Sequence, residues 1–131
     1  MTCKYEKIEW TEEMNGVKVD CSLDVAIPPT SSNTILLTIP GVDGSVDGYK
    51  DKYLRIAESV QEENKVSVVR ISNPFITSFH WESNIRQVLD YISINLPSIT
   101  EGNTAEIRVV AHSAGAAVAA QIAWEYPEIK R

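Results

Sequence analysis

Cysteine and histidine are scarce in this sequence, which has two of each in 131 residues. Cys3 and Cys21 are too few for a disulfide framework, and no Cys-x-x-Cys spacing is present. We therefore expect both thiols to be reduced, as thiols are in the cytoplasm.

Basic residues are in the minority, with 12 Lys and Arg against 18 Asp and Glu and a formal net charge of −6. Phosphate backbones and anionic membranes attract basic surfaces, so this balance argues against nucleic-acid and membrane partners. Long apolar runs are also missing: none approaches the roughly 18 residues of a membrane span, and the N-terminus lacks the apolar core of a signal peptide. The hydrophobic fraction of 44% is ordinary. We expect one cytoplasmic domain over residues 1–131.

The N-terminal part has the pattern of a β-hairpin. Apolar and polar residues alternate over 17–27, a period of two that is typical of a strand with one buried face. Asn15-Gly16 precedes it, and this pair accepts the positive φ angles of a tight turn. Residues 5–13 are the expected partner strand.

From residue 35 onward, nearly continuous apolar runs alternate with segments of helical periodicity. Such runs suit strands that are covered on both faces, and their alternation with helices predicts a mostly parallel sheet with flanking helices. The expected strands are 35–39, 66–71 and 107–111, and the expected helices are 49–60, 85–96 (ended by Pro97) and 115–124.

The strongest local motif is Ala111-His112-Ser113-Ala114-Gly115, which stands between a predicted buried strand and a predicted helix. A serine on a sharp turn at that junction is exposed, and small neighbours are needed for the strand and helix to approach each other. The helix start also offers free N–H groups and the positive end of a dipole. The alternative is an ordinary turn in which Ser113 caps the helix.

This motif resembles the nucleophile elbow of the α/β-hydrolase family, with Ala111 in the first glycine position of Gly-x-Ser-x-Gly. Ile39-Pro40-Gly41-Val42 follows the first buried strand, where the family often has His-Gly. The resemblance implies a truncated α/β-hydrolase fold that lacks the C-terminal strands. It also implies that Ser113 is the nucleophile and that the backbone N–H groups of Val42 and Ala114 form the oxyanion hole.

The family's order of catalytic residues is Ser, then Asp or Glu, then His, but no histidine follows Ser113 here. We therefore expect this chain to be incomplete as a catalyst, and inactive or very weak by itself. His80, in a predicted loop over 72–82, is a candidate substitute base that Glu82 could orient. The alternative is a loop histidine that lines a pocket or is solvated.

The segment Asp43-Gly44-Ser45-Val46-Asp47-Gly48 partly matches the spacing of a calcium-binding loop. The glutamate expected at position twelve is Leu54, and no helix is predicted before the segment, which argues against an EF-hand. We interpret it as a turn with Asp47 near the start of the next helix. We expect no metal ion and no cofactor.

Three functions remain open on these residues. The first is esterase- or lipase-like hydrolysis of a small-molecule acyl or ester substrate. The second is a non-catalytic module that binds either a second copy of itself or a partner that completes the sheet, because strand 107–111 would be an exposed apolar edge that invites pairing with another chain. The third is acyl transfer by the same elbow, because a fold does not fix the reaction.

Overall fold

The computed structural model describes residues 4–14, 16–28, 33–41, 45, 47, 49–64, 66–72, 78–100, 106–112, 114–126 and 129–130. The strands are β1 (Lys4–Met14), β2 (Val17–Ile27), β3 (Thr34–Ile39), β4 (Ser67–Ile71), β5 (Glu106–Ala111) and β6 (Ile129–Lys130). The α-helices are α1 (Lys52–Asn64), α2 (Ser78–Ile94), α3 (Leu96–Ile99) and α4 (Ala114–Ile122), with 3-10 turns η1 (Tyr49–Asp51) and η2 (Ala123–Glu125).

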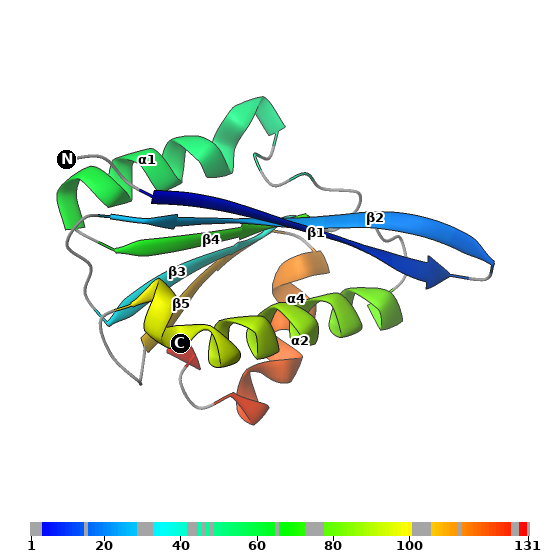
Figure 1. The fold of residues 1–131 in the computed structure, drawn as a ribbon. Coiled ribbons are helices and arrows are strands. Elements are labelled where there is room, and N and C mark those ends of the chain that lie inside the picture. The colour runs from blue at the N-terminus through cyan, green and yellow to red at the C-terminus, as the bar shows by residue number, and fades with distance from the viewer. Residues whose placement is uncertain are drawn as a thin grey trace.

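The six strands form one mixed sheet in the order β1-β2-β4-β3-β5-β6 (Figure 1). β1 pairs with β2 and β2 with β4 in antiparallel fashion, whereas β4, β3, β5 and β6 pair with one another in parallel. The predicted fold class, a mostly parallel sheet with flanking helices and an antiparallel N-terminal hairpin, is confirmed.

The N-terminal hairpin closes through a two-residue connection, since Met14 pairs with Val17. Gly16 has a φ of 81°, a left-handed conformation that glycine adopts without steric cost. This agrees with the turn expected at Asn15-Gly16, although Asn15 itself lies outside the described residues.

The helices cover the two faces of the sheet unequally. α1 lies on one face, and α2 and α4 lie on the other (Figure 1). We call these the α1 face and the α2 face. The larger core lies on the α2 face, where Leu37, Ile39 and Val69 of the central strands pack against Ile85, Leu89 and other residues of α2. A smaller cluster on the α1 face contains Leu36, Ala57 and Val68.

Two predictions are wrong, one about where a helix ends and one about which strand forms the edge of the sheet. Pro97 does not end the helix that precedes it: α2 ends at Ile94, and Pro97 lies in the first turn of α3, where its missing N–H costs nothing. The strand at 107–111 is not the outermost one, because β6 pairs with Ile107 and Arg108 of β5. No helix in the described ranges is long and apolar enough to cross a membrane.

Candidate active site

The junction between β5 and α4 is sharp, as the motif at 111–115 predicts. β5 ends at Ala111 and α4 begins at Ala114. The Gly115 N–H donates a hydrogen bond of 3.0 Å to the His112 carbonyl, and the His112 N–H donates one of 3.1 Å to the Ile39 carbonyl. Ser113 lies outside the described residues, between His112, which is hydrogen-bonded to the end of β3, and Gly115, which is hydrogen-bonded to His112.

Gly115 fills a position where a side chain would collide with neighbouring backbone. A Cβ atom placed on it would lie 2.4 Å from the Pro40 carbonyl oxygen and 3.0 Å from Cγ2 of Ile39. Real Cβ atoms do not approach backbone oxygen so closely, so a side chain here would push α4 away from β3. The glycine therefore allows the start of α4 to touch the backbone at Pro40, next to Gly41.

Tyr53 connects α1, on the α1 face of the sheet, to the end of β3 beside the β5–α4 junction. Its side chain is buried, and its hydroxyl donates a hydrogen bond of 3.3 Å to the Ile39 carbonyl, the same oxygen that accepts from His112. Burial raises the pKa of the Tyr53 hydroxyl, so the group keeps its proton and remains a donor. The Tyr53 backbone N–H donates to the Asp47 carbonyl at 2.8 Å.

Arg70 is a charged residue inside the sheet, only 5% exposed. Its Nη1 lies 2.5 Å from Oδ1 of Asp47, and its Nη2 lies 3.3 Å from Oδ2 of Asp24. Asp24 and Thr38 are its neighbours on β2 and β3. The Asp47 carboxylate thus serves as the partner of a buried cation. The predicted placement of Asp47 near the start of the next helix is correct, since η1 begins at Tyr49.

The turn between Asp47 and α1 has a strained backbone. Lys50 and Asp51 have φ values of 52° and 59°, in the left-handed region that residues with a Cβ rarely adopt. Each such residue costs on the order of 1–3 kcal/mol and persists only when its surroundings hold it. Here the Asp47 carbonyl accepts from both Tyr53 and Leu54, which closes the turn.

No protein-family model matches this sequence, and a comparison with curated proteins finds no match. Among solved structures, the peroxisomal α/β-hydrolase Lpx1 of Saccharomyces cerevisiae is 16% identical with a TM-score of 0.62, over 96% of this chain and 42% of that one. XC6422 of Xanthomonas campestris, an α/β serine hydrolase without a lid, is 16% identical with a TM-score of 0.63, over 93% and 57%. The chain has the α/β-hydrolase fold.

A third structure with this fold is FphF, a fluorophosphonate-binding serine hydrolase of Staphylococcus aureus. It is 15% identical with a TM-score of 0.59, over 98% of this chain and 54% of that one. The chain therefore spans about half the length of the α/β-hydrolase structures it matches.

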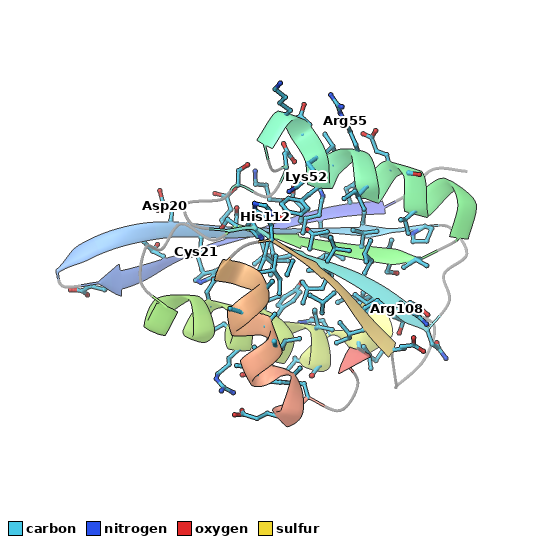
Figure 2. The ribbon with its side chains drawn as sticks, turned by 180° about the vertical axis from the view of Figure 1, so that it is seen from behind. Asp20, Cys21, Lys52, Arg55, Arg108 and His112 are labelled. Atoms are coloured by element: carbon cyan, nitrogen blue, oxygen red, sulfur yellow. The ribbon has the colours of Figure 1, made fainter. Side chains whose placement is uncertain are left out.

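His80 is not in a loop, which corrects the sequence-based expectation: it is the third residue of α2, which begins at Ser78. The helix follows β4 and so starts at the carboxyl edge of the parallel strands, the edge at which β5 also ends. The side chains of His80 and Glu82 lie outside what the structure describes. His112 is exposed where β5 meets α4 (Figure 2), and it directly precedes Ser113 in the sequence.

The other predicted site residues stay predictions. Val42 lies outside the described residues, between Gly41 and Ser45, which are described, and Ala114 is the first residue of α4. Asp43 also lies outside them. In the described ranges, no group of three or more His, Cys, Asp or Glu side chains could hold a metal ion.

The sequence analysis missed Arg70 and Tyr53, which contact Asp47 near the end of β3. Arg70 had a visible signal, because an arginine inside the apolar run at 66–71 needs a carboxylate partner if the strand is buried. Tyr53 had none beyond helical spacing, since nothing in the sequence shows that its hydroxyl reaches the Ile39 carbonyl.

Proposed function

We propose that this chain carries the nucleophile half of a serine hydrolase that cleaves a small-molecule ester or related acyl bond. Ser113 is the nucleophile, and the backbone N–H groups of Val42 and Ala114 are the oxyanion donors. The observation that carries the proposal is the close approach of Gly115 to Pro40, because it brings the start of α4 against the end of β3, the two segments that carry the elbow motif and the Pro40-Gly41 motif.

The chemistry follows from that arrangement. The Ser113 oxygen attacks the acyl carbon while a general base takes the hydroxyl proton, and the negative charge that develops on the carbonyl oxygen is stabilised by the two N–H groups. The alcohol leaves with a proton, and water then hydrolyses the acyl-enzyme. The start of α4 favours negative charge at this point, because its first N–H groups have no partner within the helix.

The base is the part of this mechanism that the sequence does not supply in the usual way, since no histidine follows Ser113. In our proposal it is supplied from outside these 131 residues. His80 is the candidate within them, because α2 begins at the edge of the sheet where β5 ends. Turnover by this chain alone is then expected to be slow.

The proposal can be tested by covalent labelling with a fluorophosphonate reagent, followed by peptide mass spectrometry. Slow labelling of Ser113 is expected in the wild type and in Ser98→Ala, which changes an exposed serine of α3. None is expected in Ser113→Ala. Labelling that persists in Ser113→Ala would contradict the nucleophile assignment.

Hydrolysis of p-nitrophenyl acetate tests the source of the base. Fast turnover that Ser113→Ala abolishes would retain the nucleophile but contradict an external base, and His80→Ala would then show whether His80 is that base. If turnover is slow and unaffected by His80→Ala, the base lies outside the chain as proposed.

A second candidate is self-association through the β6 edge of the sheet. β6 covers only Ile107 and Arg108, so in the described ranges residues 109–111 of β5 have no strand partner on that side. Val110 is among the exposed large apolar side chains. Unpaired backbone next to an apolar side chain favours pairing with a second copy, and a monomer at high concentration in light scattering would contradict this candidate.

A further inference from the structure

Three polar residues form a row across the α1 face of the sheet. Asp24 on β2 lies opposite Arg70 on β4, and Arg70 is in register with Thr38 on β3. Neighbouring strands lie about 4.8 Å apart, so these three side chains stand next to one another. Arg70 and Thr38 are 5% and 0% exposed, and the Asp24 side chain is 20% exposed. The row is therefore largely shielded from solvent.

Each residue of this row has a buried polar atom without a hydrogen-bond partner among the described residues. These atoms are Oδ1 of Asp24, Nε of Arg70 and Oγ1 of Thr38, and the described residues contain only one other such side-chain atom, Oδ1 of Asn84. Buried polar atoms in folded proteins are nearly always hydrogen-bonded, either to protein or to ordered water. Three such atoms in one row point to a single ligand that they share.

Two of the three atoms flank a contact that already exists. Nη2 of Arg70 lies 3.3 Å from Oδ2 of Asp24. Nε is bonded to the same carbon as Nη2, and Oδ1 is bonded to the same carbon as Oδ2. The unpartnered donor and the unpartnered acceptor therefore lie on either side of one ion pair, and Thr38 is on the strand next to Arg70.

The chemistry of these atoms determines which ligand fits. The Arg70 Nε–H group can only donate, the ionised Asp24 carboxylate can only accept, and the Thr38 hydroxyl can do both. A ligand that contacts all three must both accept and donate hydrogen bonds. An anion would face the Asp24 carboxylate, and a metal ion would face the Arg70 guanidinium. Water is neutral, small enough for a closed site, and is held by two to four polar partners when buried.

We propose that this row binds an ordered internal water molecule. The water accepts a hydrogen bond from Nε of Arg70, donates one to Oδ1 of Asp24 and is hydrogen-bonded to the Thr38 hydroxyl. It connects β2, β4 and β3 on the α1 face, one residue before the Ile39 carbonyl that accepts from Tyr53. The site does not depend on the proposed hydrolase function, because none of its atoms belongs to the elbow motif.

A crystal structure that resolves ordered waters tests the site directly. The expected result is a density peak at hydrogen-bond distance, about 2.7–3.2 Å, from Nε of Arg70 and Oδ1 of Asp24. A direct hydrogen bond between these two atoms, with no peak beside them, would overturn the proposal. So would a peak that gives an anomalous signal after a bromide soak or that lies at metal-ligand distance, because the occupant would then be an ion.

The sign of a stability change tests the role of Thr38 independently. Thr38→Val removes the hydroxyl but keeps the β-branched shape, so strand propensity changes little. It takes one partner from the bound water, and we expect it to lower the melting temperature by a few degrees. If the hydroxyl has no partner, Thr38→Val should instead raise the melting temperature, because burying an unpaired polar group is costly. That result would overturn the proposed site.

Thr34→Val is the matched control. It makes the same chemical change on the same strand and the same face, four residues before Thr38. The density peak beside Arg70 is expected to remain at full occupancy in Thr34→Val and to weaken in Thr38→Val. Equal weakening in both variants would show that Thr38 does not contact the water and would contradict the site as proposed.

Discussion

The two faces of the sheet use their buried residues differently. On the α2 face, the inward side chains of the central strands are apolar and pack against α2 and α4. On the α1 face, the same strands present Leu36 and Val68 near one end and Thr38 and Arg70 near the other. Because side chains alternate along a strand, neighbouring residues such as Leu36 and Leu37 belong to different faces.

The two faces therefore differ in what they contribute, one mainly to the free energy of folding and the other mainly to the position of nearby residues. A continuous apolar core supplies most of the free energy of folding, since that energy scales with the apolar area removed from water. A buried ion pair adds little net stability, because desolvation of the charges offsets their attraction. We therefore expect the α2 face to hold the fold together and the α1 face to fix Asp47 and Tyr53 beside the end of β3.

The largest effect is expected from truncation on the α2 face. Leu37→Ala should lower the free energy of unfolding by about 3–5 kcal/mol, because Leu37 is fully buried in the larger core. Leu36→Ala is the matched control on the same strand, and it should cost about 2 kcal/mol because Leu36 belongs to the smaller cluster. Urea unfolding followed by tryptophan fluorescence measures both. Equal losses would contradict the division between the faces.

A smaller change in the free energy of unfolding is expected for Gly115→Ala, and its sign decides between two explanations. In an open helix, Gly→Ala stabilises by about 1 kcal/mol through helix propensity. Gly115→Ala should instead destabilise by about 1–3 kcal/mol, because its Cβ would overlap the Pro40 carbonyl. Thermal unfolding measures the sign, and Ala116→Gly, at an exposed position of α4, controls for propensity. A more stable Gly115→Ala protein would show that α4 does not press on β3.

The smallest effect is expected from the Tyr53 hydroxyl. Burial raises its pKa above the ordinary value of 10.0, so above about pH 10 the unfolded chain loses this proton while the folded chain keeps it. Stability then falls as the pH rises through that range. Tyr53→Phe should cost about 1 kcal/mol at neutral pH by losing the bond to Ile39, and its stability should fall less steeply from about pH 9 to about pH 11.

Urea unfolding at several pH values measures this slope. Burial also raises the pKa of Tyr91 and Tyr126, and both remain in Tyr53→Phe, so part of the alkaline fall persists. An unchanged slope in Tyr53→Phe would contradict a buried, protonated hydroxyl at residue 53.

Much of the fold could be predicted because its strands carry clear local patterns. The alternation over 17–27 indicated the hairpin, and the apolar runs at 35–39 and 66–71 correctly indicated strands buried on both faces. Boundaries failed where local and tertiary effects compete. α2 begins at Ser78, before its apolar periodicity starts, and Pro97 fits into a short helix of its own.

The site was predictable only in part, for a related reason. The turn at 111–115 is a local motif, and its place between a strand and a helix is confirmed. The strand itself is not buried on both faces as predicted, because Arg108 and Val110 of β5 are exposed. The roles of Ser113, Val42 and His80 stay predictions. Arg70, Asp24 and Asp47 are far apart in the sequence, and their contact depends on the strand order β2-β4-β3, which no local pattern contains.

Arg70 has one more consequence, for how β4 finds its place during folding. Ser67–Ile71 is short and mostly apolar, so its apolar side chains alone would tolerate either face of the sheet. A slip by one residue would move the guanidinium from Asp24 into the apolar core around Leu37, without a carboxylate partner. The single charge in β4 therefore specifies the register of the strand, because the misaligned sheet would bury an unpaired charge.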